Sequence, residues 1–323
     1  MRLALLFSPQ GSQVVGMGRE LAQASPAARA AFEEADAVLG WSVSGTCWEG
    51  PQDRLDDTRQ TQPCLLTASV AAHRALGERT RLSPSFAAGH SVGEYAALVA
   101  AGVLELAAAL RLVLRRAELM AAAGGAGGAG GAGGMAAVIG LDRGAVERVV
   151  DGIGRPTELV VANDNAPGQV VISGSRDALE LAGDGMRAAG ARRVIPLPVS
   201  GAFHSPLMAS VAQDLARAFE AEAWRDATIP VVSNVTAEPL TDASRIRALL
   251  AEQVRSPVEW VRSVERMAAD GVDTVVELGS GTALVGMVRR IAPRVRAMAV
   301  TDVATLADAA VELGTSPAEA SVR

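Results

Sequence analysis

Short apolar runs alternate with longer amphipathic segments along this chain. Near the N-terminus, LALLFS predicts a strand, and the segments GRELAQASPAARAAFEEADAVL and PCLLTASVAAHRAL that follow have the apolar spacing of helices. Further on, FAAGHSVGEYAALVA predicts a strand, a sharp turn and a helix, and AAALRLVLRRAELMAAA predicts another long helix. Strands that alternate with helices in this way favour an α/β fold with a largely parallel sheet.

Residues 135–198 interrupt this regular alternation. Their patterns predict a strand, a helix, two strands, a helix and a strand, which is the element order of a ferredoxin-like subdomain. Alternation returns in residues 199–307, for example in VDTVVELG followed by ALVGMVRRI. We therefore predict a large α/β domain, made of residues 1–124 and 199–307, that is interrupted by a small inserted ferredoxin-like domain.

A run of glycine and alanine precedes the small domain. We predict that residues 125–134 form a flexible Gly/Ala linker. The run contains a match to the dinucleotide pattern G-x-G-x-x-G, but it follows a predicted helix and precedes a predicted strand, which is the reverse of the order that nucleotide binding needs. The match therefore does not indicate a nucleotide site. At the other end, residues 308–323 are predicted to be a polar tail.

With 323 residues, of which 49% are hydrophobic, the chain can bury the cores of about two globular domains. Its two cysteines, Cys47 and Cys64, lie in unrelated contexts, so we expect neither a disulfide framework nor a metal site. The N-terminal MRLALLFSPQ lacks the continuous apolar core of a secretion signal, and no apolar stretch is long enough to span a membrane. We expect a cytoplasmic protein in a reducing compartment.

The chain contains no lysine, so all 30 basic residues are arginines. This composition excludes mechanisms that need a Schiff-base lysine or a P-loop lysine. A formal charge of -6 and only 3% aromatic residues argue against nucleic acid as a partner. An acidic macromolecular partner stays open, because a local arginine patch can attract it whatever the total charge.

The sequence GHSVG places Ser91 between a predicted strand and a predicted helix. This is the nucleophile-elbow pattern, in which small residues flank a serine on a strained turn and the next amide, that of Val92, can stabilise an oxyanion. A second interpretation is that Ser91 caps the helix together with Glu94, because SVGE also fits a capping box. The motif alone leaves the two interpretations equally open.

A nucleophilic serine needs a base, and the chain has three histidines. His73 lies in an amphipathic helical pattern and is interpreted as a surface or packing residue. His90 directly precedes Ser91, so strand alternation should turn its side chain to the opposite side. His204 follows a predicted strand in the loop VSGAFHSPLM, where catalytic residues commonly lie, and is the best candidate base.

No carboxylate stands out as a partner for that histidine, although Asp164 lies between Ser91 and His204 in the chain. A backbone carbonyl could orient the imidazole instead. Arg111, Arg115 and Arg116 share one predicted helix, and one of them could turn inward to offer a planar fork to a substrate carboxylate. Spacing alone does not choose among the three.

Segments along nearly the whole chain resemble the malonyl-CoA:acyl carrier protein transacylases, the acyltransferases of bacterial fatty-acid and polyketide synthesis. In chain order the matching segments are QGSQVVGMG, TQPCLLTASVA, GHSVGEYAALVAAGVL, RLVLRRAELM, MAAVIGL, NDNAPGQVVISG, LPVSGAFHSPLM, IPVVSNVTAEPL, QVRSPVEW and ELGSGTALVGMV. Their order and spacing are far more specific than the serine motif alone. The resemblance implies an α/β-hydrolase-like large domain with a parallel sheet and an inserted ferredoxin-like small domain.

The resemblance also implies the roles of individual residues. Matched by motif, Ser91 is the nucleophile, His204 is the base, and Arg116 binds the carboxylate of the substrate. The family attacks a malonyl thioester of coenzyme A with this serine and passes the malonyl group to the phosphopantetheine thiol of an acyl carrier protein. No tightly bound cofactor is implied, since the coenzyme A thioester is a substrate.

Further residues are assigned by the same matching. The backbone amides of Gln10 and Val92 match the oxyanion hole of the family. The backbone carbonyl of Gln253 matches the group that orients the histidine, and Asn165 matches an active-site asparagine. Phe203 matches a position at which, in related polyketide acyltransferases, phenylalanine accompanies malonyl and serine accompanies methylmalonyl, so malonyl is the expected acyl group.

Three departures from the family pattern stand out. The family usually reads Phe-Pro-Gly-Gln-Gly-Ser-Gln, whereas this chain has FSPQGSQ, with Pro9 directly before Gln10. Proline lacks an N–H of its own but leaves the Gln10 amide available. The family's Gly-Pro-Gly near the C-terminus is GSG here, at residues 279–281, and the segment before the small domain is expanded into the Gly/Ala run.

Acyl carrier proteins are acidic, so the docking surface should be basic. Two adjacent pairs are the candidates, Arg192 with Arg193 and Arg289 with Arg290. The alternatives to malonyl transfer are a trans-acting polyketide acyltransferase with another acyl group, a malonyltransferase subunit of malonate decarboxylase, an acyl hydrolase on the same fold, and a non-catalytic carrier-protein-binding member.

Overall fold

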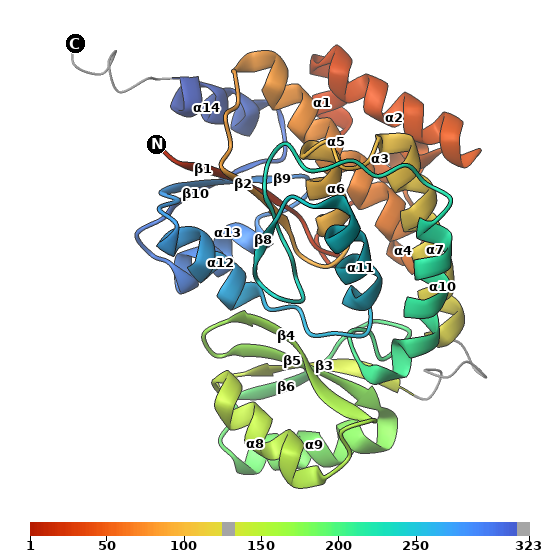
Figure 1. Ribbon diagram of the computed structural model, residues 1–323, viewed down its shortest axis with the longest axis vertical. Helices are drawn as coiled ribbons and strands as arrows, with labels where there is room; N and C mark the ends of the chain where they lie inside the picture. The colour runs from red at the N-terminus through yellow and green to blue at the C-terminus, as the bar shows by residue number, and fades with distance from the viewer. Residues whose placement is uncertain (125–132, 315–323) are drawn as a thin grey trace.

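A six-stranded sheet forms the centre of the larger part of the molecule, within the residues 1–124 and 133–314 that the computed structural model describes (Figure 1). The strands in spatial order are β10 (Arg296–Val300), β9 (Thr274–Leu278), β1 (Leu3–Phe7), β2 (Phe86–Gly89), β7 (Val231–Val232) and β8 (Pro239–Leu240). Neighbours pair in parallel, except that β8 runs antiparallel to β7. The predicted parallel sheet is confirmed.

Strand β1 explains why this sheet is buried on both faces. All five of its residues, LALLF, are buried, as expected for a central strand of a parallel sheet. Leu5 and Phe7 pack into one core cluster with helices α5 (Thr58–Arg79) and α7 (Leu106–Gly124). Leu6 packs into a second cluster with α12 (Trp260–Ala269) and α13 (Ala283–Ile291). The sheet therefore lies between two layers of helices.

The helices around the large sheet are mostly continuous amphipathic segments. In chain order they are α1 (Arg19–Ala24), α2 (Pro26–Leu39), α3 (Val43–Glu49), α4 (Gln52–Asp56), α5 (Thr58–Arg79), α6 (Gly93–Ala100), α7 (Leu106–Gly124), a 3₁₀ turn (Pro206–Met208), α10 (Ala209–Phe219), α11 (Ala243–Gln253), α12 (Trp260–Ala269), α13 (Ala283–Ile291) and α14 (Val303–Gly314). No helix of the described residues is long and apolar enough to cross a membrane.

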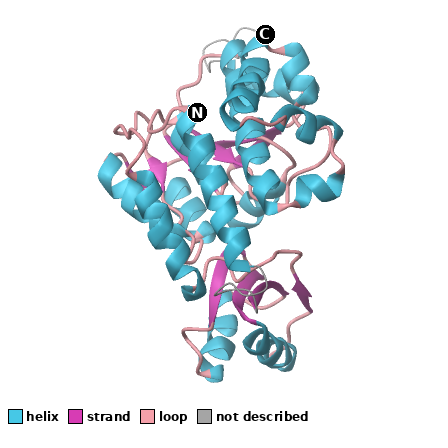
Figure 2. Cartoon of the chain, turned by 90° about the vertical axis from the view of Figure 1, so that its right-hand side faces the viewer, coloured by secondary structure: helices cyan, strands magenta, loops and turns pink. Residues whose placement is uncertain are grey.

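A second, smaller sheet lies beside the large one and has its own core (Figures 1 and 2). Its elements are β3 (Gly133–Ile139), α8 (Arg143–Ile153), β4 (Leu159–Ala166), β5 (Gln169–Ser175), α9 (Arg176–Ala188) and β6 (Arg193–Pro196), in the order that the sequence predicted. The strands pair antiparallel in the spatial order β4-β5-β3-β6. We call this region, residues 133–196, the small part and the remainder the large part.

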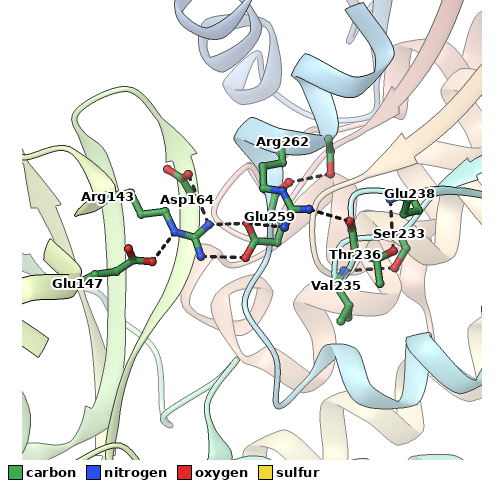
Figure 3. A network of polar contacts seen from close by, with 10 residues as sticks. Arg143, Glu147, Asp164, Ser233, Val235, Thr236, Glu238, Glu259 and Arg262 are labelled. Carbon is green, nitrogen blue, oxygen red and sulfur yellow. Dashed lines mark hydrogen bonds and ion pairs between the residues drawn. The ribbon is translucent and has the colours of Figure 1, made fainter. Parts of the chain in front are cut away.

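The two parts are joined through β4. The Val258 amide of the large part donates to the Ala162 carbonyl at 2.8 Å, and the Asp164 amide donates to the Val258 carbonyl at 3.1 Å. Arg143, at the start of α8, reaches across to Glu259 with both guanidinium ends and also contacts Asp164, with 3.7 Å between Arg143 Nη1 and Asp164 Oδ2 (Figure 3). Burial raises the pKa of Asp164 to about 6, against the opposing effect of Arg143.

Some sequence-based boundaries differ from the structure. The predicted linker 125–134 lies mostly outside the described residues, and its last two glycines begin β3. The predicted polar tail from residue 308 is wrong as far as Gly314, because α14 continues to that residue and buries Leu313 in the core. Strand β10 was not predicted, since its segment RAMAV alternates only weakly between apolar and polar residues.

Candidate active site

Ser91 stands on a sharp turn between β2, which ends at Gly89, and α6, which begins at Gly93. Its φ angle is 53°, in the left-handed region that non-glycine residues rarely adopt. The flanking glycines make the turn possible: a Cβ atom on Gly89 would lie 2.0 Å from the Gly93 carbonyl, and one on Gly93 would lie 2.3 Å from the Phe7 carbonyl. The two glycines therefore allow the strained backbone conformation of Ser91.

The Ser91 hydroxyl lies against the His204 imidazole, with 2.8 Å between Oγ and Nε2. His204 Nδ1 lies 2.9 Å from the Gln253 carbonyl and 3.2 Å from the Ser256 carbonyl. Because carbonyls only accept, Nδ1 carries the proton and Nε2 is left as the acceptor for the serine hydroxyl. Serine, histidine and a backbone carbonyl thus form a chain of hydrogen bonds.

Burial strongly affects this histidine. His204 is 4% exposed and has a φ angle of 57°. Desolvation, followed by the positive charge of Arg116, lowers the pKa of His204 to about 3. The imidazole is therefore neutral at physiological pH and able to accept a proton.

Arg116 is the inward-facing arginine of α7. It is 1% exposed and donates from Nη2 to Ser91 Oγ at 3.0 Å and from Nη1 to Gln62 Oε1 at 2.7 Å. Its Nε–H has no hydrogen-bond partner in the described part of the chain. The other two candidate arginines are exposed: Arg111 pairs with Glu222 and Arg115 with its helix neighbour Glu118.

Two side-chain amides hold the turn in place. Asn234 accepts from the Ser91 amide at 2.7 Å and donates to the Gly89 carbonyl at 2.7 Å. Gln253 donates to the Ser91 carbonyl at 2.9 Å and accepts from Arg116 at 3.1 Å. Both peptide groups of the strained serine are therefore fixed by residues far away in the sequence.

The capping interpretation of Ser91 and Glu94 is wrong. In the described part of the chain no side chain caps helix α6, and the Ser91 hydroxyl hydrogen-bonds His204 instead. Glu94 is 4% exposed and accepts from Gln253 Nε2 at 2.7 Å and from the Asn234 amide at 3.4 Å. Glu94 therefore accepts hydrogen bonds from residues distant in the sequence and does not form the capping box.

A cavity of about 490 Å³ opens onto Ser91 and His204. Among the sequence candidates, Gln10, Asn165 and Phe203 line it, and Met120 and Met135 add apolar surface. Val92 is buried directly after Ser91, at the start of α6. The remaining lining residues are Pro9, Gly11, Gln13, Gln52, Asp56, His90, Asn163, Val171, Leu197, Pro198 and Val199.

The other two histidines have packing or supporting positions. His90 lines the cavity and hydrogen-bonds Asn165, with 2.8 Å between Nε2 and Oδ1. It does not turn away from Ser91 as strand alternation predicted, because β2 has already ended at Gly89 and the serine backbone is left-handed. His73 packs against Phe7, and burial lowers its pKa to about 4.

The four arginines proposed for docking are all exposed. Arg290 donates to Gln169 at 2.8 Å and to the Pro167 carbonyl, in the turn between β4 and β5. The Gly168 carbonyl in that turn accepts a hydrogen bond from the Gly140 amide. Gly140 in turn lies against Arg192, since a Cβ on Gly140 would be 2.9 Å from the Arg192 side chain. Arg290 and Arg192, one from each pair, therefore lie near the same turn.

Sequence reasoning assigned no role to Gln62 or Asn234, and it misplaced Glu94. Gln62 and Asn234 lie in segments that matched the family, TQPCLLTASVA and IPVVSNVTAEPL. The available signal was a polar residue within an otherwise apolar segment. Such a residue is buried only when it has specific partners.

Comparisons with known proteins identify the family to which the chain is similar. Residues 4–308 match the acyl transferase domain family. The chain is 42% identical to the malonyl CoA-acyl carrier protein transacylase of Bacillus subtilis, over 94% of this chain and 95% of that protein, and 41% identical to that of Escherichia coli K12, over 97% and 99%. A solved complex of a type II polyketide synthase acyl-carrier protein with its malonyl-transacylase superposes with a TM-score of 0.92 at 40% identity, over 97% of this chain and 100% of that one.

Proposed function

The chain belongs to the acyl transferase domain family, and on that premise we propose that it transfers a malonyl group from malonyl-CoA to the phosphopantetheine thiol of an acyl carrier protein. The main support for the proposal is the position of Arg116, a buried cation beside the Ser91 hydroxyl, whose Nε–H has no partner among the residues that the structure describes. Such a guanidinium offers donors to the carboxylate of a malonyl group. Plain acyl groups have no carboxylate to pair with it.

In the first half of the reaction, Ser91 Oγ attacks the thioester carbonyl while its proton passes to His204 Nε2. The new bond joins Oγ to the carbonyl carbon, and the bond from that carbon to sulfur breaks. Coenzyme A leaves as its thiol after receiving the proton from His204. The amides of Gln10 and Val92 are the proposed oxyanion hole, supported by the location of Val92 at the start of α6 and of Gln10 on the cavity wall.

In the second half, the thiol of the carrier protein attacks the malonyl ester of Ser91. His204 accepts the thiol proton and returns it to Ser91 Oγ as the ester bond breaks. The Gln253 carbonyl keeps the imidazole in the required tautomer through both halves. Atoms and charges balance without any bound cofactor.

The carrier protein would dock on the surface near the β4–β5 turn, through Arg192, Arg193, Arg289 and Arg290. The exposure of all four, and the approach of Arg290 and Arg192 to this turn, support the assignment. Acidic carrier proteins are attracted to such a basic surface by long-range electrostatics. A relative was solved with its acyl-carrier protein bound.

The proposal also covers the acyl group that the cavity accepts and the arrangement of the domains. Phe203 lines the cavity at 4% exposure, which supports a pocket sized for malonyl. The element order of the small part supports a ferredoxin-like domain inserted at residues 135–198 into an α/β-hydrolase-like domain of residues 1–124 and 199–307. A cytoplasmic location stays a prediction of the composition.

Intact-mass measurement after mixing with a panel of acyl-CoAs tests the function. We expect a malonyl adduct on the wild type, no adduct on Ser91→Ala, and loss of the adduct when holo carrier protein is added. Labelling that persists in Ser91→Ala would overturn the assignment of the nucleophile. Release of the adduct to water in place of the carrier thiol would favour a hydrolase, and absence of any adduct would favour a non-catalytic binding protein.

A further inference from the structure

Glu94 is a buried carboxylate next to the active site that the proposed reaction does not use. It is 4% exposed, and its Oε2 accepts from Gln253 Nε2 at 2.7 Å and from the Asn234 amide at 3.4 Å. Desolvation raises the pKa of Glu94 to about 7, against the opposing effects of Gln253, Asn234 and Arg116. At pH 8 it is therefore mostly ionised and accepts hydrogen bonds without donating any.

The amide of Gln253 links this carboxylate to three active-site groups. Its Nε2 donates to Glu94 and to the Ser91 carbonyl, and its Oε1 accepts from Arg116. Its backbone carbonyl meanwhile accepts from His204. A rotation of the amide by 180° would turn N–H groups toward the Arg116 guanidinium and an oxygen toward two acceptors.

Arg116 depends on that orientation because its own contacts are neutral. Its guanidinium donates to Gln62, to Ser91 and to Gln253, and none of these is a carboxylate. Glu94 is the negative carboxylate whose charge acts on Arg116 inside the fold. The amide of Gln253 lies between the two charged groups and is polarised by both.

We propose that Glu94 is a positioning residue: it locks the Gln253 amide so that the oxygen faces Arg116, and it thereby sets the guanidinium for the substrate carboxylate. The proposal deepens the proposed malonyl transfer and rests on it for its kinetic consequence. Without the Glu94 acceptor, one of the two hydrogen bonds that Gln253 Nε2 donates is lost. The Gln253 donors then compete for the space beside Arg116, which shifts the guanidinium away from Ser91 Oγ.

Three substitutions separate the possible roles of this residue. Glu94→Gln keeps an acceptor oxygen at the same reach and removes the charge. Glu94→Asp keeps the charge but withdraws the acceptor by one methylene group. Glu94→Met fills a similar volume without an oxygen acceptor. The rate of Ser91 acylation at pH 8 is measured for each with malonyl-CoA and with acetyl-CoA.

The readout is the ratio of the malonyl rate to the acetyl rate. We expect Glu94→Gln to keep the wild-type ratio within about twofold, and Glu94→Asp and Glu94→Met to lower it about tenfold, a loss in the range typical of one buried hydrogen bond. A structural defect that merely lowers the active fraction reduces both rates equally and leaves the ratio unchanged. That result, or a low ratio in Glu94→Gln with a normal one in Glu94→Asp, would overturn the proposal.

A second measurement does not depend on the reaction. In protein labelled with ¹⁵N-glutamine, the side-chain NH₂ signal of Gln253, identified by its absence in Gln253→Met, should move and exchange faster with solvent in Glu94→Asp than in Glu94→Gln. An unchanged signal in Glu94→Asp would refute the lock even if the wild type proved inactive toward malonyl-CoA. A shifted signal in an inactive wild-type background would refute only the proposed function.

Discussion

Arg116 Nη2 lies 3.0 Å from Ser91 Oγ, so a buried guanidinium and the imidazole of His204 contact the same serine oxygen. The imidazole removes the proton, and the cation lowers the free energy of the negative charge that then develops on the oxygen. The same cation attracts a carboxylate of the substrate. One side chain therefore links reactivity to acyl selection.

Replacement of Arg116 by alanine should separate malonyl from plain acyl substrates. We expect Arg116→Ala to lower the rate of Ser91 acylation by malonyl-CoA about a hundredfold, because a bidentate charged pair is lost, and to lower the rate with acetyl-CoA much less. Quenched-flow mixing followed by intact mass measures both rates. The matched control is Arg111→Ala on the same helix, which loses only a surface ion pair with Glu222 and should leave both rates near wild type.

The acid limb of the rate profile should lie far below the ordinary range for histidine. The active form of His204 is neutral, and its pKa of about 3 keeps it neutral as the pH falls from 8 to 5.5. We expect kcat/KM for acylation to change less than about twofold over this range in Glu94→Gln, which removes the buried carboxyl group next to the active site whose pKa is raised to about 7. A half-maximal rate near pH 6.5 in that variant would contradict the lowered pKa.

Charge reversal on the proposed docking surface should affect only the second half of the reaction. We expect the double variants Arg192→Glu/Arg193→Glu and Arg289→Glu/Arg290→Glu to raise KM for the carrier protein about tenfold, with a weaker dependence on salt. Acylation by malonyl-CoA should be unchanged. Arg217→Glu, an exposed arginine on α10, is the control, and an equal rise in KM there would remove the assignment.

A second buried carboxylate predicts how stability changes with pH. Glu277 is fully buried, accepts from Ser8 Oγ and the Val285 amide, and has its pKa raised by desolvation from 4.5 to about 7. The native state therefore holds this proton more tightly than the unfolded state, and the free energy of unfolding falls as the pH rises from 4.5 to 7, by up to about 3 kcal/mol.

Removal of the Glu277 carboxyl group should abolish its contribution to this pH dependence. We expect the stability of Glu277→Gln relative to wild type to increase by up to about 3 kcal/mol between pH 5 and pH 8, as measured by urea denaturation. The exposed Glu220→Gln serves as the control and should show no such increase. A constant difference at both pH values would contradict the raised pKa of Glu277.

Local sequence was sufficient to predict the groups that the backbone places directly. Ser91 is exposed by a turn that two nearby glycines permit, and His204 lies in a loop after the predicted strand ARRVIPLPV. The choice of Arg116 over Arg111 and Arg115 could not come from spacing, because it depends on which face of α7 packs against α5. Only the resemblance to a known family selected it.

Glu94 illustrates why the remaining polar network could not be predicted from the sequence. A glutamate three residues after a serine fits a helix cap, and nothing within the segment argues against that interpretation. Its actual partners, Gln253 and Asn234, lie 159 and 140 residues away. The tertiary fold decides between a local and a distant hydrogen bond, and short patterns contain no information about the distant one.

The reactive groups come from one part of the chain, whereas both parts contribute to the walls of the cavity. Ser91, His204 and Arg116 belong to the large part, whereas Asn165 and Met135 reach the cavity from the small part. Exchange of residues 133–196 between relatives would therefore replace one side of the cavity and leave Ser91, His204 and Arg116 in place.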